Sequence, residues 1–521
     1  MQKETIMNGA ESLVGTLVAS GVEVCFANPG TSEMHFVAAL DKISGMRAIL
    51  CLFEGVVTGA ADGYGRMAEK PACTLLHLGP GLANGLANLH NARRAATPMV
   101  NIVGDHATYH ARYDAPLASD VAGFGRPVSG WVRSSSSALT VAADAARAVQ
   151  ASMEPPGQVA TLILPADIAW SEADRQAPAL TRLPISAPDA KAVCQAAKAL
   201  RSGKTAAILI RGSALKEPGL KTAGRISAAT GARILCDTLA PRIQRGAGRV
   251  VAERIPYLAE DIVEFLKGLE QLILVGAIPP VTFFAYPGKT SWPTPEGCKI
   301  MVLSHAHEDG TAALDALADT LNAPPGSVKV AGLATPTLPK SGNLDPCAVM
   351  QVIAYYLPEG AIVADEALTS GLPYFHYTAT AAPHDYLNLP GGAIGGMMPV
   401  GTGAAVACPG RKVVCLEGDG SAMYTLQALW TQAREKLDVT TVIYANRSYA
   451  ILNIELARVG IDRPGSTARS LFDLHNPTLD WVKLAEGMGV EAARAETTDR
   501  FADLFASAMK TPGPRLIEAV I

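Results

Sequence analysis

The sequence lacks several features that mark common classes of protein. No two of its nine cysteines form a CxxC pair, and several, such as Cys25 and Cys415, lie inside apolar runs. Free buried thiols in a reducing compartment explain this pattern better than disulfides do. The net charge is −4 and no basic tail or stripe is present, which argues against a nucleic-acid partner.

Long apolar runs are also missing. No stretch of about 20 residues rich in Leu, Ile and Val occurs, and residues 393–407 are Gly-rich and contain Pro399, so we expect no membrane span. The amino end has no apolar signal core and leads directly into an amphipathic helix. We therefore expect a soluble, cytoplasmic protein.

What the chain does contain points to large hydrophobic cores. Its 521 residues are 49% hydrophobic and 18% charged, which favours about three globular domains. Proline-containing linkers at 175–188 and 324–343 separate three α/β segments. We predict an α/β fold with three doubly wound parallel-sheet domains at 1–180, 190–330 and 344–521.

Short apolar runs predict the strands, and 3.6-residue periodicity predicts the helices. We expect strands at 22–26, 49–53, 73–77, 99–103, 159–164, 206–210, 233–236, 272–275, 300–303, 413–416 and 439–445. We expect helices at 11–19, from residue 54, from about residue 82, and around 426–433.

The stretch from Val413 to Ile451 organises the rest of the chain. An apolar strand ends at Gly418-Asp419-Gly420, an amphipathic helix follows, and a second strand ends at Asn446-Arg447-Ser448. Parallel strands joined by a helix place both loops at the same carboxyl edge of the sheet. We therefore expect Asp419 and Asn446 to meet.

This pair of loops has the chemistry of a metal and phosphate site. A carboxylate, an amide oxygen and a backbone carbonyl are hard oxygen ligands that suit magnesium or calcium, with diphosphate oxygens completing the shell. Gly418 and Gly420 let the backbone approach phosphates. Gly-Asp-Gly alone is also an ordinary turn, and the whole strand–GDGS–helix–strand–NRSY unit is far more specific.

That unit resembles the thiamin-diphosphate binding motif, in which GDG is followed some two dozen residues later by Asn. Here 25 residues lie between Gly420 and Asn446. The resemblance implies thiamin diphosphate with Mg²⁺ (or Ca²⁺). It assigns the metal to Asp419, Asn446 and Ser448, and diphosphate contacts to Ser421 and Tyr449.

Two further segments match the same family. Gly391 to Gly395 resembles the segment whose carbonyl, here near Gly392, holds the aminopyrimidine group, with Ile394 as the apolar wedge that bends the cofactor. Glu54 begins a small-residue helix after an apolar strand. By itself it is a helix N-terminal Glu favoured by the helix dipole. By resemblance it is the catalytic Glu that bonds the aminopyrimidine ring, and it is supplied by another subunit.

The first-domain loops resemble those of benzoylformate decarboxylases. His77 ends a strand before Gly79-Pro80-Gly81, and Asn84 follows seven residues later. The resemblance makes His77 a catalytic histidine and Asn84 a neighbour of the cofactor, although a lone His is more often a satisfied core residue. Thr31 stands where the family has an active-site Ser, so we predict that Thr31 and His77 together orient the substrate carboxylate.

The substrate-facing residues depart from that family. The middle-domain stretch VGAIPPVTFFAYPG has Phe283 and Phe284 in place of a histidine. Leu452 is kept after the metal loop, but Glu455 appears one turn later. Glu455 either borders the substrate cavity as an unpaired charge, or faces solvent or pairs with Arg458.

Three interpretations of the loop GDHATYH stay open. His106 and His110 are substrate ligands, an i,i+4 metal pair, or part of a solvated loop. Acetolactate synthases have a glutamine in this region, and this chain does not.

The resemblance covers the whole chain and implies a thiamin-diphosphate-dependent 2-oxo acid decarboxylase, most like the benzoylformate decarboxylases. Its expected reaction converts a 2-oxo acid to an aldehyde, with carboligation to a 2-hydroxy ketone as a second outcome. The alternatives are an acetolactate synthase-type carboligase and an idle binding subunit. The family further implies a homodimer at least, and a homotetramer as the expected assembly.

Overall fold

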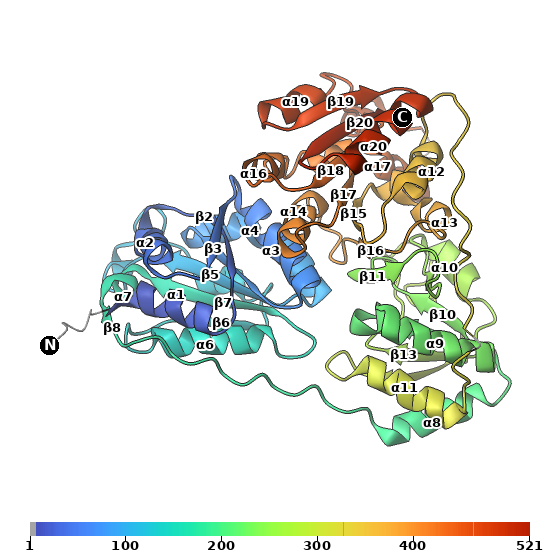
Figure 1. Cartoon of the computed structure of the whole chain (residues 1–521), viewed down its shortest axis with the longest axis horizontal. Coiled ribbons are helices and arrows are strands. Elements are labelled where there is room, and N and C mark those ends of the chain that lie inside the picture. The colour runs from blue at the N-terminus through green and yellow to red at the C-terminus, as the bar shows by residue number, and fades with distance from the viewer. Residues whose placement is uncertain (1–6, 327, 462) are drawn as a thin grey trace.

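The computed structural model describes residues 7–326, 328–461 and 463–521, which form three parallel sheets with helices on both faces (Figure 1). The first sheet has the order β3-β2-β4-β5-β7-β6. Its strands are β2 (Val24–Asn28), β3 (Arg47–Leu50), β4 (Ala72–Leu76), β5 (Met99–Asp105), β6 (Trp131–Ser134) and β7 (Val159–Pro165).

Helices cover both faces of this first sheet. One face packs against α1 (Gly9–Ala19), α2 (Met34–Lys42) and α6 (Val141–Ser152). The other packs against α3 (Glu54–Ala68) and α4 (Leu78–Ala95). Minor elements here are β1 (Met7–Asn8), β8 (Glu172–Ala173), α5 (Val121–Gly125) and α7 (Ala166–Trp170).

The second sheet has the order β12-β10-β9-β13-β14. Its strands are β9 (Ala206–Ile210), β10 (Arg233–Cys236), β12 (Glu253–Arg254), β13 (Gln271–Val275) and β14 (Lys299–Ser304). Its helices are α8 (Ala190–Leu200), α9 (Glu217–Thr230) and α11 (Gly310–Leu321) on one face and α10 (Ala259–Leu266) on the other.

The third sheet has the order β11-β16-β15-β17-β18-β20-β19. Its strands are β11 (Arg242–Arg245), β15 (Ile362–Glu366), β16 (His384–Leu387), β17 (Val413–Gly418), β18 (Val439–Ala445), β19 (Glu491–Ala495) and β20 (Arg515–Val520). The helices around it are α12 (Pro346–Tyr356), α13 (Tyr374–Tyr377), α14 (Met397–Ala407), α15 (Asp419–Ala422), α16 (Ala428–Arg434), α17 (Ala450–Arg458), α18 (Ser466–Ser470), α19 (Trp481–Gly487) and α20 (Thr498–Lys510).

The predicted α/β class with parallel sheets is confirmed, with two antiparallel departures. β1 pairs antiparallel with β8 in a separate two-stranded sheet. β11 comes from the central part of the chain, yet it pairs antiparallel with β16 in the third sheet. The division of the chain at the two linkers stays a prediction, and residues 1–6, 327 and 462 of the predicted domains lie outside the described residues.

The start of α4 corrects another expectation. Gly79-Pro80-Gly81 was predicted as a turn before a helix from about residue 82, but the helix begins at Leu78. Pro80 therefore lies in the first turn, where its missing N–H removes no helical hydrogen bond.

Glycines bring the first and third sheets together through α3 and α14. A Cβ at Gly63 would overlap the Val400 carbonyl, and one at Gly403 would overlap the Ala60 carbonyl, so both helices need glycine to approach this closely. One hydrophobic core contains Val57 of α3 as well as Leu429 of α16. The packing holds the loops of the third sheet beside α3 and α4 (Figure 1).

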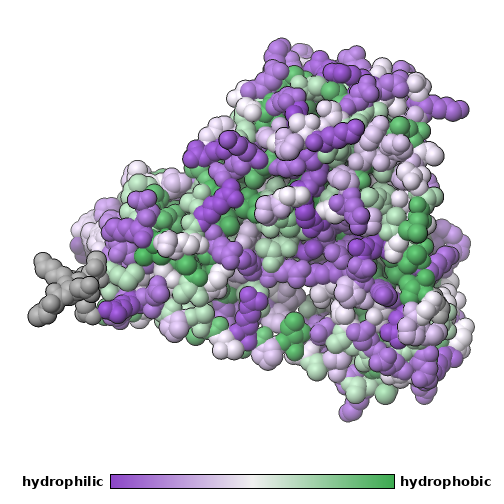
Figure 2. Space-filling model, viewed as in Figure 1, coloured by the Kyte–Doolittle hydropathy of each residue, from purple (hydrophilic) through white to green (hydrophobic). Residues whose placement is uncertain are grey.

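The outer surface is mixed. Figure 2 shows hydrophilic residues over most of the visible face, with hydrophobic residues in separate patches, as folded globular chains ordinarily have. Within residues 7–326, 328–461 and 463–521, no helix combines the length and apolar character needed to cross a membrane.

A buried histidine predicts how stability depends on pH. Burial, aided by the Arg245 charge, lowers the pKa of His384 to about 3. Its Nδ1 lies 2.7 Å from the Ala382 carbonyl and its Nε2 lies 2.9 Å from the Tyr374 hydroxyl, so the neutral ring donates to the first and accepts from the second. Below pH 6.5 the unfolded chain binds a proton that the folded chain excludes, so stability falls with acidification.

When the pH falls from 7 to 5, we expect the buried neutral His384 to lower the free energy of unfolding by about 2 kcal/mol. Urea unfolding at both pH values measures the change. A His384→Gln variant should show a pH dependence smaller by that amount. The same pH dependence in both proteins would contradict the assignment.

Candidate active site

Asp419 and Asn446 lie at the carboxyl edge of the third sheet. β17 and β18 are parallel neighbours, with Gly418 paired to Tyr444. The backbone N–H of Arg447 donates to Asp419 Oδ2 at 2.6 Å, which ties the two loops together. The predicted meeting of the Asp419 and Asn446 loops is thus a feature of the structure.

The electrostatics of Asp419 suit a cation. Burial raises the pKa of Asp419 to about 6, and the N–H groups of Arg447 and Gly420 oppose the shift. A bound cation stabilises the charged form of a buried carboxylate such as this one, for which no ion pair is found among the described residues. Asn446 Oδ1 accepts from Ser448 N–H at 2.9 Å, which folds the second loop back toward the same edge.

The residues present fit a metal–diphosphate group. A Cβ at Gly420 would overlap the Tyr449 ring, so any other residue here would force that ring to move where the two loops touch. Ser421 Oγ donates to the Gly418 carbonyl at 3.0 Å. In the part of the chain that the structure describes, no group of three His, Cys, Asp or Glu side chains could hold a metal. The oxygen set of Asp419, Asn446 and a backbone carbonyl contains only one such side chain, so the two findings agree.

Sequence reasoning missed two hydroxyls at this edge. Thr369 and Ser370 lie in the short 3-10 helix Leu368–Gly371, which follows β15 and packs beside β17 and α17. The signal was available, because this loop leaves a neighbouring parallel strand at its carboxyl end.

Segment 391–396 is held by side chains from several elements. Glu366 accepts the backbone N–H groups of Gly395, Gly396 and Met397. Burial raises the pKa of Glu366 to about 7, against the effect of those donors. Sequence analysis did not select Glu366, although a carboxylate at the end of a buried strand was visible. Gly392 has a φ of 72° and is exposed, and Ile394 packs partly against the core.

Glu54 begins α3, as expected. Its side chain is buried, and Asn84 Nδ2 of α4 donates to Glu54 Oε2 at 3.0 Å. The structure therefore brings together Glu54 and Asn84, two of the residues selected from the sequence.

His77 is held by residues of the loop after β2 that were not selected from the sequence. Its Nδ1 lies 2.8 Å from Glu33 Oε2 and 3.3 Å from Ser32 Oγ, whereas Thr31 is exposed. A carboxylate accepts, so Nδ1 carries the proton and Nε2 is left to face a ligand. Glu33 was missed because its side chain turns inward from a loop that reads as a simple turn.

The Glu455 charge is not unpaired, which corrects the first of the two interpretations. Glu455 accepts from the Tyr286 hydroxyl, and Arg458 Nε lies 3.5 Å from Glu455 Oε2. A small cavity is lined by Glu455 together with Phe283, Phe284, Tyr257 and Tyr286, among others. The middle segment therefore meets α17, and Leu452 lies exposed on the same helix.

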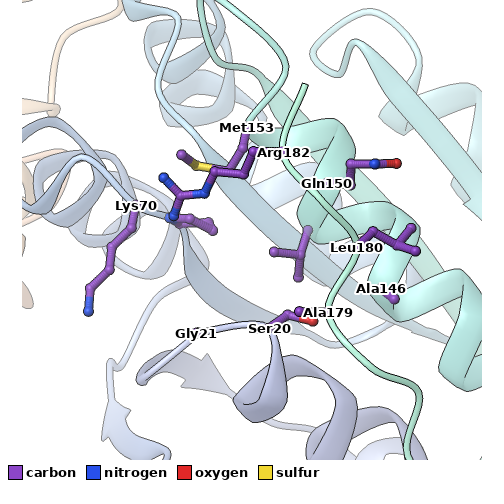
Figure 3. A pocket seen from close by; sticks show the side chains of 11 residues that line it. Ser20, Gly21, Lys70, Ala146, Gln150, Met153, Ala179, Leu180 and Arg182 are labelled. Atoms are coloured by element: carbon purple, nitrogen blue, oxygen red, sulfur yellow. The ribbon is translucent and has the colours of Figure 1, made fainter. Parts of the chain in front are cut away.

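The structure does not assign a role to His106, and the hollow in Figure 3 lies away from the site. The rings of His106 and His110 are 5.6 Å apart, and the three interpretations of this loop stay open. The hollow in Figure 3 lies between α6 and the linker that carries Leu180 and Arg182, and Lys70 also lines it. Lys70 precedes β4, so this hollow lies at the amino edge of the first sheet, away from Glu54.

The fold and this edge of loops are those of an α/β protein whose residues fit a metal and a diphosphate, and comparisons with known proteins supply the family. The family model "Thiamine pyrophosphate enzyme, N-terminal TPP binding domain" matches residues 7–122, and its C-terminal counterpart matches residues 371–519. Thiamine pyrophosphate is another name for thiamin diphosphate.

Full-length relatives agree. The chain is 54% identical over 518 residues, 99% of each chain, to a Mycobacterium tuberculosis protein named "Putative acetolactate synthase large subunit IlvX". It is 28% identical over 529 residues, 96% of each, to the benzoylformate decarboxylase of Pseudomonas aeruginosa. A solved thiamine diphosphate-dependent 4-hydroxybenzoylformate decarboxylase from Rhodococcus jostii RHA1 shares the fold, with a TM-score of 0.84, 22% identity and 98% coverage of each chain.

The chain belongs to the thiamine pyrophosphate enzyme family. It is a thiamin-diphosphate-dependent enzyme of the decarboxylase and acetolactate synthase group.

Proposed function

We propose that this protein catalyses non-oxidative decarboxylation of a 2-oxo acid to an aldehyde, using thiamin diphosphate and Mg²⁺. The observation that carries the proposal is the junction of the two loops after β17 and β18, where Arg447 N–H bonds Asp419. Asp419, Asn446 and the Ser448 carbonyl would hold Mg²⁺ against the diphosphate. Gly418, Gly420, Ser421 and Tyr449 would line the diphosphate.

When bound, thiamin diphosphate supplies a nucleophilic carbon and an electron sink for the pair left by departing carbon dioxide. Glu54, oriented by Asn84, would hold and share a proton at the aminopyrimidine ring. Gly392 and Ile394 would contact the same ring. Active sites of this design contain residues of two subunits, so we propose a homodimer at least, and a homotetramer.

His77 would serve the substrate. Glu33 holds its Nδ1, so Nε2 would accept or donate a proton at the substrate carboxylate or at the new aldehyde carbon. Thr31 contributes a hydroxyl from the adjacent loop, and Leu452 and Glu455 would line the cavity for the acyl group. His106 stands further along the same sheet edge as a candidate substrate contact.

One relative supports a second function. The 54% identical protein bears an acetolactate synthase name, which supports carboligation of two 2-oxo acids to a 2-hydroxy acid with an acyl branch and one carbon dioxide. The two functions differ in what captures the activated acyl group: a proton in one and a second carbonyl in the other.

A single assay separates the two functions. The protein is incubated with Mg²⁺, thiamin diphosphate and each of a panel of 2-oxo acids that includes pyruvate and benzoylformate, and carbon dioxide, aldehyde and acetolactate are measured. We expect carbon dioxide and aldehyde in equal amounts. Acetolactate as the main product from pyruvate would favour the carboligase, and no carbon dioxide from any acid would reject both.

The cavity beside Glu455 predicts a change in substrate preference. Glu455→Phe removes a paired carboxylate and adds apolar surface facing Phe283 and Phe284, which should favour an aromatic acyl group. We expect kcat/KM for benzoylformate relative to pyruvate to rise about tenfold, as burial of a phenyl group would allow.

Glu455→Gln is the matched control, because it keeps the size of the side chain and an oxygen for the Tyr286 hydroxyl. It should change the ratio much less than Glu455→Phe does. An unchanged ratio in Glu455→Phe would remove this residue from the substrate cavity.

A further inference from the structure

Two buried asparagines of α4 contact the segment that would hold the cofactor ring. Asn88 is 3% exposed and Asn91 is 1% exposed, and their spacing of three residues places both on one face of the helix. That face is turned toward the start of α3 and toward segment 391–396. Neither residue belongs to the set selected from the sequence.

Asn88 joins three separate pieces of the chain. Its Nδ2 donates to the Gly55 carbonyl at 2.7 Å and to the Gly395 carbonyl at 3.1 Å. Its Oδ1 accepts from Asn91 Nδ2 at 3.0 Å. One amide thus links the first turn of α3, directly after Glu54, to a loop of the third sheet.

Asn91 bonds the backbone of the same loop at Ala393, two residues before Gly395. Its Nδ2 donates to the Ala393 carbonyl at 2.8 Å, and its Oδ1 accepts the Ala393 N–H at 3.2 Å. Both amide hydrogens and the oxygen of each asparagine are therefore used. A fully satisfied buried polar pair specifies one arrangement, because any shift leaves a buried polar group without a partner.

The segment needs such an anchor. Residues 388–396 form neither helix nor strand, and Gly392 and Gly395 have φ values of 72° and 85°. Backbone of this kind has no ladder of its own hydrogen bonds to hold it. Glu366 and Thr425 fix the segment within the third sheet's own surroundings, while Asn88 and Asn91 fix it against α3 and α4.

We propose that Asn88 and Asn91 are positioning residues that hold segment 391–396 in the conformation that binds the cofactor ring. The proposal rests on the proposed function, since it takes Gly392 and Ile394 as contacts of thiamin diphosphate. The pair acts through the backbone of Ala393 and Gly395 and does not itself touch the reacting atoms.

The test compares Asn88→Ala and Asn91→Ala with a matched variant, Asn101→Ala. Asn101 is also fully buried and also bonds through both ends of its amide, to Thr74 and Thr161, but within the first sheet. All three variants lose buried hydrogen bonds, so each should lose some stability. Thermal unfolding measures this shared loss, against which the specific effects are compared. We call Asn88→Ala and Asn91→Ala the clamp variants. If one of them does not fold, the other still carries the test.

Two measurements are made on the full chain. Hydrogen–deuterium exchange of the peptide that covers residues 389–398 is followed without cofactor, and thiamin diphosphate is titrated with Mg²⁺ by calorimetry. We expect both clamp variants to exchange this peptide at least about tenfold faster and to raise the cofactor Kd about tenfold or more, as loss of a hydrogen bond to a buried group would give. Asn101→Ala should change neither.

The outcomes separate the inference from the proposed function. Unchanged exchange of the peptide, or a cofactor Kd that moves no more than in Asn101→Ala, would overturn the positioning role. An unmutated protein that does not bind thiamin diphosphate would overturn the proposed function instead, and would be seen before any variant is made.

Discussion

Asp419→Ala is expected to abolish magnesium-dependent binding of thiamin diphosphate. The side chain is the one carboxylate in the proposed ligand set, and its burial means that solvent does not compete strongly for a cation there. Without it, the diphosphate would lose the charge that bridges it to the protein. Calorimetric titration of cofactor with Mg²⁺ measures the loss.

Two further variants test whether the loss of binding comes from the charge of Asp419. Asp419→Asn keeps the shape and an oxygen for the Arg447 N–H but removes the charge, so it should also lose binding. Asp309→Ala removes an aspartate that caps a helix of the second sheet, through Ala312 N–H at 2.9 Å, and should bind normally. Unchanged cofactor affinity in Asp419→Ala would reject the metal site.

Glu54→Gln is expected to leave cofactor binding nearly intact and to slow exchange of the cofactor C2 proton by a hundredfold or more, on the order of 3 kcal/mol. Glutamine keeps an oxygen for Asn84 Nδ2 but has no proton to share with the aminopyrimidine ring. Nuclear magnetic resonance of the quenched reaction in deuterium oxide measures the exchange.

Glu69→Gln provides the control at the other end of α3. Glu69 follows the last residue of the helix and pairs at the surface with Lys216. Its replacement should leave C2 exchange unchanged. Exchange at the unmutated rate in Glu54→Gln would show that Glu54 has only a structural role at the start of α3.

Short apolar runs predicted several strands and the meeting of two loops from the sequence. β9, β10 and β18 have the bounds that their largely apolar or β-branched runs predicted, because buried strands of a parallel sheet are covered on both faces. The Asp419 and Asn446 loops could be placed together for the same reason. Parallel neighbours joined by a helix leave their following loops at one edge of the sheet, whatever surrounds them.

The sequence did not predict which side chains of different elements contact each other. The contact between Glu33 and His77 was not predicted, because the loop 28–33 is too short for periodicity to tell which side chain points inward. The joint action of His77 and Thr31 on the substrate stays a prediction. Glu455 lies in one cavity with Phe283 and Phe284 and pairs with Tyr286, and these contacts depend on how the segment after β13 meets α17.

The sequence by itself determined the α/β class, the strands with clear apolar runs, that Glu54 begins a helix, and that Asp419 and Asn446 follow parallel strands, because these follow from local hydrophobic patterns and the geometry of parallel strands. Only the tertiary structure decided that β11 joins the third sheet, that Glu366 caps segment 395–397, and that Asn88 links this segment to α3. Those contacts join residues more than 25 positions apart, and no local pattern encodes which distant backbone group a buried polar side chain will meet.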